Sequence, residues 1–200
     1  MNDHTGLAGL EKDELYAMAR EFDGLRAEIL GSYTSRSLPD LTSAAQHLTT
    51  LTNLVKDVSD AVLFRAADTD PGLDFGPVIL AYTSAADTAG HALASYTEAF
   101  AQLGFLRRYK EYRPNPDLQD ARRAAFAVTQ DGLDNTVGNL QETADSLRRS
   151  SDRIDGTPPR VLAALSRSSS PANSIYRVPA MAPAAPAMRL AYTPEPRHVR

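Results

Sequence analysis

The densest cluster of chemically capable side chains lies in a seven-residue stretch near the middle of the sequence. Its members are Arg107, Arg108, Tyr109, Lys110, Tyr112 and Arg113. Four cations could contact phosphates while the two tyrosine rings stack on bases. The same residues could instead end a helix, where cations favour the negative end of the helix dipole and tyrosines cover the end of a bundle. We therefore treat these six residues as candidate contacts to a partner or to phosphate groups.

The histidines give little support for a metal site. Asp87 and His91 are four residues apart, so they share one face of an expected helix, but two ligands are too few for a metal ion. The apolar pattern places His91 away from the core, where we expect a solvated side chain. His47 flanks another apolar stripe, and we expect it at the boundary of the core. The sequence predicts neither a metal nor a cofactor.

No catalytic constellation stands out. There is no Cys, and no Ser lies in a Gly-x-Ser-x-Gly turn. No pair of acids suggests a general acid and base, and most carboxylates near the N-terminus are expected on a solvated helix face. Those carboxylates are Glu11, Asp13, Glu14, Glu21, Asp23 and Glu28. We expect no catalytic residue and a protein that is not an enzyme.

The composition of the 200 residues narrows the class of protein further. Without Cys, a disulfide scaffold, a Cys-ligated zinc site and an iron–sulfur cluster are excluded. No apolar run is long enough to span a membrane, and the first residues do not form a secretory signal, so we expect a cytoplasmic protein. Arg outnumbers Lys by 18 to three beside 31 Ala. This bias indicates a GC-rich bacterial genome, or Arg selected for forked contacts to carboxylate or phosphate.

Charge and proline divide the chain near residue 155. Residues 1–155 hold 15 Lys and Arg against 24 Asp and Glu, whereas residues 156–200 hold six Arg and one acid. Eight of the 13 prolines lie in the second segment. Such a segment buries too little apolar surface to offset its chain entropy. We predict an acidic helical domain over residues 1–155 and a basic, mostly disordered, Pro/Ala/Ser-rich tail over residues 156–200.

The apolar residues of the first segment recur every three or four positions, as on one face of a helix. Leu15, Met18, Phe22, Leu25 and Ile29 show the pattern, and three later stripes repeat it. The pattern predicts helices near 7–30, 38–67, 74–110 and 116–154. Because the connections are short, consecutive helices should be antiparallel. We therefore predict an all-α fold, an antiparallel up-down four-helix bundle with coiled-coil-like crossings.

Several residues at the expected helix ends are of types that commonly start or end helices. Gly31 can adopt the left-handed conformation that closes a helix. Ser37 resembles the cap of the second helix, with Asp40 reaching back in a capping box. Asp74 can cap the third helix, and Asn115 with Pro116 can start the fourth.

Small residues distinguish the last two expected helices. Alanines recur along the third helix and would let another helix approach closely. In the fourth helix, Gly132 and Gly138 each cost about 1 kcal/mol relative to Ala, so it is the weakest of the four, and the sequence leaves open whether it is broken near Gly132. The third stripe also carries Tyr82 and Tyr96, which bring polar oxygens into an apolar seam.

Three functions remain open at this stage. The favoured hypothesis is a non-enzymatic interaction or scaffold protein that self-associates or binds a protein partner, with a tail that recruits it. The alternative is a nucleic-acid-associated accessory protein that uses Arg107–Arg113 and the basic tail. A third is a small-molecule or metal-binding bundle built around Tyr82 and Tyr96.

Overall fold

The computed structural model describes residues 4–68, 75–113 and 115–156, which form four long helices. These are α1 (His4–Ser32), α2 (Leu41–Ala67), α3 (Gly76–Arg108) and α4 (Pro116–Gly156). Apart from a single bridge between Thr34 and Ser37, the described residues contain no β-structure. The predicted all-α four-helix bundle is confirmed. The predicted tail lies outside the described residues.

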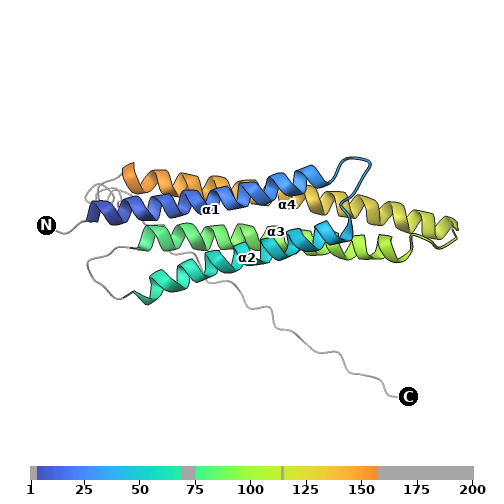
Figure 1. The fold of residues 1–200 in the computed structure, drawn as a ribbon, viewed down its shortest axis with the longest axis horizontal. Coiled ribbons are helices and arrows are strands. Elements are labelled where there is room, and N and C mark those ends of the chain that lie inside the picture. The colour runs from blue at the N-terminus through green and yellow to red at the C-terminus, as the bar shows by residue number, and fades with distance from the viewer. Residues whose placement is uncertain (1–3, 69–74, 114, 157–200) are drawn as a thin grey trace, which may run out of the picture.

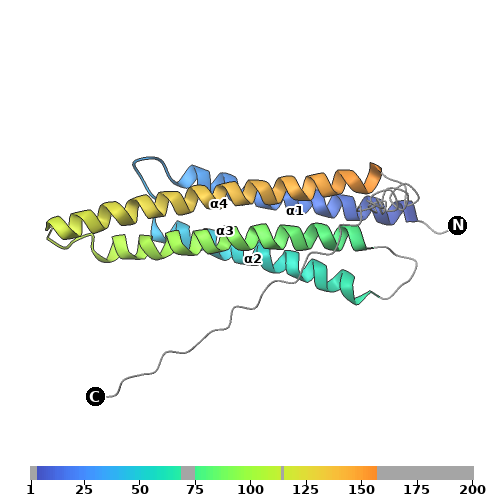
Figure 2. The same cartoon turned by 180° about the vertical axis from the view of Figure 1, so that it is seen from behind.

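The four helices run up, down, up and down (Figure 1). α3 packs most extensively against α4, α4 also packs on α1, and α2 packs on α3, whereas α1 and α2 touch only weakly. The hairpin of α3 and α4 projects beyond the ends of α1 and α2, as both views show (Figures 1 and 2). One end of the molecule, which we call the tip (residues 100–113 and 115–128), is therefore built by α3 and α4 alone.

The predicted stripes form the core. Leu15, Phe22 and Ile29 of α1 are fully buried, as are Tyr82 and Tyr96 of α3. On α4 the buried face also includes threonines that the pattern did not predict, at positions 129, 136 and 143. Each donates its hydroxyl to the carbonyl four residues earlier, at 2.7–2.8 Å. The hydroxyls are thus satisfied inside their own helix, and the methyl groups can face the core.

The start of α2 differs from the prediction. Asp40, not Ser37, is the N-cap: its carboxylate accepts from the amides of Thr42 at 2.8 Å and Ser43 at 3.1 Å. Ser37 instead exchanges backbone hydrogen bonds with Thr34 in the loop before the helix. The carboxylate is the better cap here because it accepts both amides at once and also the hydroxyl of Ser43.

The prediction for Gly31 was wrong, and the structure answers the question that the sequence left open at Gly132. Gly31 lies inside α1 and does not adopt the left-handed conformation, because the helix continues to Ser32. α4 runs unbroken through Gly132. A Cβ on Gly132 would lie 3.0 Å from both the Ala99 Cβ and the Ser95 carbonyl oxygen of α3. Of the described glycines, Gly132 is therefore the one at which α3 and α4 approach each other most closely.

The other helix ends follow the sequence more closely. Asn115 caps α4 as predicted, accepting from the Leu118 amide at 2.7 Å, and Pro116 is the first helical residue. Arg107 and Arg108 lie in the last turn of α3. The cap predicted at Asp74 lies outside the described residues, and the N-cap of α3 is Phe75.

Candidate functional site

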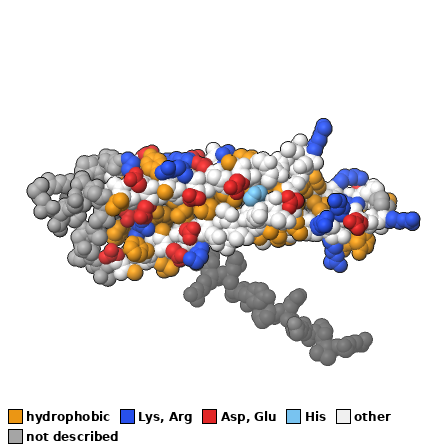
Figure 3. Space-filling model, viewed as in Figure 1, with side chains coloured by type: hydrophobic (Ala, Val, Ile, Leu, Met, Phe, Trp, Pro, Cys, Tyr) orange, Lys and Arg blue, Asp and Glu red, His pale blue; other side chains and the backbone are white. Residues whose placement is uncertain are grey.

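The six candidate residues of the 107–113 stretch lie at the tip, but they do not form one patch. Arg107 and Arg108 occupy the last turn of α3, and the others follow it in the turn toward α4. Figure 3 shows Lys and Arg side chains gathered at this end of the molecule. Residues 107–123 hold six Lys and Arg and three Asp and Glu. The acidic chain therefore presents a locally basic tip.

Arg107 and Lys110 line a groove of about 720 Å³ between the tip and the start of α2. Its floor is apolar: Leu103 of α3 is buried, and Leu106 of α3 and Phe126 of α4 are half-buried. The opposite wall is the segment from Leu38 to Thr42, in which Leu41 keeps 37% of its surface exposed. We call this site the tip groove. It exists because α3 and α4 extend past the α1–α2 connection.

The charge of the tip groove is positive. Neither Arg107 nor Lys110 makes an ion pair within the described part of the chain. Asp40 is the acid that lines the groove, but its oxygens already accept from Ser43 and Thr42. The Ser43 hydroxyl, and then the amides of Ser43 and Thr42, lower the pKa of Asp40. Asp40 caps α2 and stays ionised, so the lining carries two positive charges against one negative charge.

The aromatic members of the stretch form a separate ladder outside the groove lining. Tyr109 lies between Phe105 and Tyr112, with ring centroids 4.8 Å and 5.3 Å apart. The Arg108 guanidinium lies 5.4 Å from the centre of the Tyr109 ring, within cation–π range. Tyr112 keeps 59% of its surface exposed. The ladder joins the last turn of α3 to the turn that follows it, and its last ring, Tyr112, lies mostly in solvent.

The opposite end of the bundle holds a buried arginine that the sequence analysis missed. Arg65 of α2 has only 4% of its side chain exposed. Its Nε donates to Glu11 of α1 at 2.7 Å, Nη2 donates to Glu14, and Nη1 donates to the Ala61 carbonyl at 3.0 Å. The guanidinium also lies 4.8 Å from the centre of the Tyr82 ring of α3. We call these four side chains (Arg65, Glu11, Glu14 and Tyr82) the arginine clasp.

The arginine clasp joins three helices, including the weakly packed pair α1 and α2. Burial opposes the charge of Arg65, but the hydrogen bonds with Glu11 and Glu14 outweigh it and raise the arginine pKa. Burial also raises the pKa of Tyr82 to about 12, although the Arg65 charge opposes this shift. Glu11, placed on a solvated face by the sequence analysis, is 13% exposed, whereas Glu14 is 61% exposed. Acids spaced three apart on one helix could have hinted at this pair, but their partner on α2 could not be identified from the sequence.

His47 is buried, not at the core boundary, and its Nδ1 lies 3.0 Å from the Tyr96 hydroxyl of α3. Burial lowers the pKa of His47, with a smaller opposing effect from Glu28 and Asp40, and burial raises the pKa of Tyr96. His91 is exposed as predicted, 3.9 Å from Asp87. No three His, Asp or Glu side chains of the described residues come together as a metal site would require.

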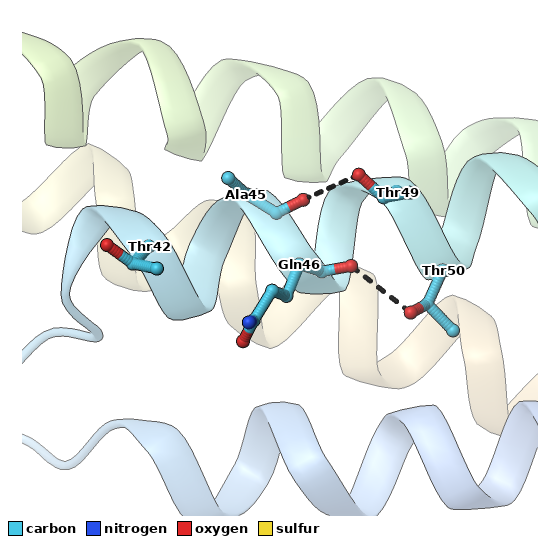
Figure 4. A pocket seen from close by; sticks show the side chains of 5 residues that line it. All are labelled: Thr42, Ala45, Gln46, Thr49 and Thr50. Carbon is cyan, nitrogen blue, oxygen red and sulfur yellow. Dashed lines mark hydrogen bonds between the residues drawn. The ribbon is translucent and has the colours of Figure 1, made fainter.

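A second, shallower depression with a volume of about 380 Å³ lies on the outer side of α2 (Figure 4). Its residues, Thr42, Ala45, Gln46, Thr49 and Thr50, carry no charge. The hydroxyls of Thr49 and Thr50 donate to the carbonyls four residues earlier, at 3.0 Å and 3.1 Å. These two threonines thus expose mainly methyl groups, and the surface offers little for specific recognition.

The fold and its surfaces define the class of protein: an up-down four-helix bundle whose last hairpin is longer than its first. No protein-family model matches the chain, and neither curated proteins nor solved structures gave a match. No described helix contains a stretch apolar enough to cross a bilayer.

Proposed function

We propose that this protein is a non-enzymatic interaction protein that binds a protein partner through its tip. The observation that carries the proposal is the lining of the tip groove. It combines apolar side chains with two cations that form no ion pair within the described residues. Central apolar contacts with a polar rim are typical of protein interfaces. The tail over residues 156–200 is proposed to assist recruitment, because its six Arg and single acid would attract an acidic partner.

Affinity capture with matched variants tests this function. The tip variant combines Leu41→Ser with Arg107→Glu. Its control, Leu80→Ser with Arg153→Glu, removes an exposed leucine and a last-turn arginine at the other end of the bundle. The full-length chain and the control should retain the same protein from an extract of the source cells, identified by mass spectrometry, and the tip variant should lose it.

Light scattering on the purified chain completes the test. Self-association that the tip variant abolishes would identify a second copy as the partner. A strict monomer that retains no protein, or a tip variant that retains the same protein as the control, would contradict the proposed function. The expected cytoplasmic location stays a prediction that fractionation of the source cells checks.

The aromatic ladder favours a second candidate, a nucleic-acid-associated accessory protein. Arg108 against Tyr109, with the exposed Tyr112 beside them, is the arrangement that stacks on unpaired bases while cations contact phosphates. A gel shift at low salt tests this, comparing the full chain with Arg107→Ala/Arg108→Ala and with a chain lacking the tail. No shift of single-stranded nucleic acid at low salt would remove this candidate.

A further inference from the structure

The tip groove lies beside the last turns of α3. Leu103, Leu106 and Arg107 lie on α3, and Lys110 lies in the turn that follows it; all four line the groove. The helical part, residues 103–108, spans about 9 Å, or nearly two turns. A groove of this length matches a helix that inserts side chains spaced three or four residues apart.

The chemistry of the lining selects the kind of partner helix. The floor of Leu103, Leu106 and Phe126 offers apolar contact, and Leu38 and Leu41 supply the opposite wall. Arg107 and Lys110 add two positive charges to the lining against the single negative charge of Asp40, so the groove keeps a net positive charge. A segment with apolar anchors beside carboxylates complements both features.

The protein's own tail does not fit this description. Residues 156–200 contain six Arg and a single acid, Glu195. Their charge has the same sign as that of Arg107 and Lys110, so the tail would be repelled from the tip groove. An acidic segment of another protein is therefore the better occupant.

We propose that the tip groove binds an acidic amphipathic helix of a partner protein, with two or three apolar anchors in the groove and carboxylates against Arg107 and Lys110. This inference rests on the proposed function and specifies its partner. The apolar anchors supply most of the affinity, because an exposed charge pair contributes little. The two cations select acidic partners over basic ones.

Fluorescence anisotropy with designed peptides tests this assignment on the full-length chain. The probe is a labelled 16-residue peptide with leucines three and four residues apart and glutamate and alanine elsewhere. One comparison peptide replaces every glutamate with lysine, and another scrambles the order so that the leucines share no face. The acidic amphipathic peptide should bind at least about tenfold more tightly than either comparison peptide.

Charge-reversal variants test whether the acidic peptide binds in the tip groove. Arg107→Glu/Lys110→Glu should weaken binding of the acidic peptide about tenfold or more. The control Arg153→Glu, also a last-turn arginine, should stay within about twofold of the original chain. Circular dichroism melts confirm that each variant is folded. Equal binding of the three peptides, or no loss on charge reversal, would overturn the assignment.

Other occupants give distinguishable results. Preferential binding of a 20-nucleotide single strand, lost on charge reversal, would overturn the assignment in favour of nucleic acid. Self-association lost in the same variant would overturn it in favour of a second copy. If the acidic peptide fails to bind while capture of a cellular protein still depends on the tip, this inference falls and the proposed function stands.

Discussion

At one end of the bundle Arg65 is buried between two glutamates and a tyrosine, whereas at the other end Arg107 and Lys110 face an open groove. A buried guanidinium is tolerated only when its donors are satisfied, and Glu11, Glu14 and the Ala61 carbonyl accept from Arg65. The exposed cations have water instead, so they need no partner inside the chain. The arginine of the clasp is held by partners inside the fold, whereas Arg107 and Lys110 form no ion pair within the described residues.

The largest expected effect comes from breaking the arginine clasp. Arg65→Ala should lower the free energy of unfolding by about 2–4 kcal/mol, because Glu11 loses its partner in a largely buried setting and Tyr82 loses a packing contact. Urea denaturation measures it. Lys56→Ala, which removes the exposed pair with Asp60, should cost less than about 1 kcal/mol. Equal losses in the two variants would mean that the clasp is no more structural than a surface ion pair.

Substitutions at the two glycines of α4 should change stability less, and in opposite directions, because Gly132 packs against α3 and Gly138 is exposed. Gly132→Ala should destabilise the fold by about 1 kcal/mol, since overpacking against Ala99 and Ser95 exceeds the gain in helix propensity. Gly138→Ala meets nothing within 4 Å and should stabilise by up to about 1 kcal/mol. The difference in unfolding midpoint between the two variants is the measurement. Stabilisation by both would show that α3 and α4 can separate slightly without cost.

The buried His47 should make stability depend on pH. Because burial lowers the pKa of His47 in the folded state, the unfolded chain binds the proton more readily. Stability should be full above the unfolded value, about 6.5, and should fall as the pH drops below it. Denaturation at pH 7.5 and 5.5 should show a smaller decrease in His47→Gln than in the original chain. An unchanged decrease in His47→Gln would contradict the assignment.

The smallest effect on stability is expected at the tip. Arg107→Glu/Lys110→Glu should change the free energy of unfolding by no more than about 1 kcal/mol, mainly through the unfavourable charge at the end of α3. The same denaturation series as for Arg65→Ala measures it. A loss as large as that of Arg65→Ala would show that these cations stabilise the fold, and would remove the contrast between the two ends.

Much of the fold could be predicted from local sequence. The three- and four-residue spacing of Leu15, Phe22 and Ile29 reflects the period of a helix, so it predicted both the helix and its buried face. Asn115 and Pro116 act within one turn of chain, and the start of α4 was correct for that reason. Where two local interactions compete, as with Ser37 and Asp40 at the start of α2, the pattern chose the wrong cap.

The candidate site was only half predictable. The cations and tyrosines of the stretch 107–113 stand out because they are adjacent in the sequence. Leu38, Leu41 and Phe126, which build the rest of the tip groove, gave no signal as a group. Their meeting depends on how far α3 and α4 extend beyond the connection between α1 and α2, which is a property of the assembled bundle.

The sequence by itself determined four amphipathic helices, their alternating directions and the position of the basic stretch, because periodicity, capping and short connections act locally. Only the tertiary structure decided the roles of individual polar residues. Gly132 is a contact point because Ala99 lies opposite, and Arg65 is a clasp because two helices bring Glu11 and Tyr82 to it. Whether a side chain is buried and which groups it contacts depend on residues far apart in the chain. These two properties distinguish the buried, ion-paired Arg65 from the exposed Arg107.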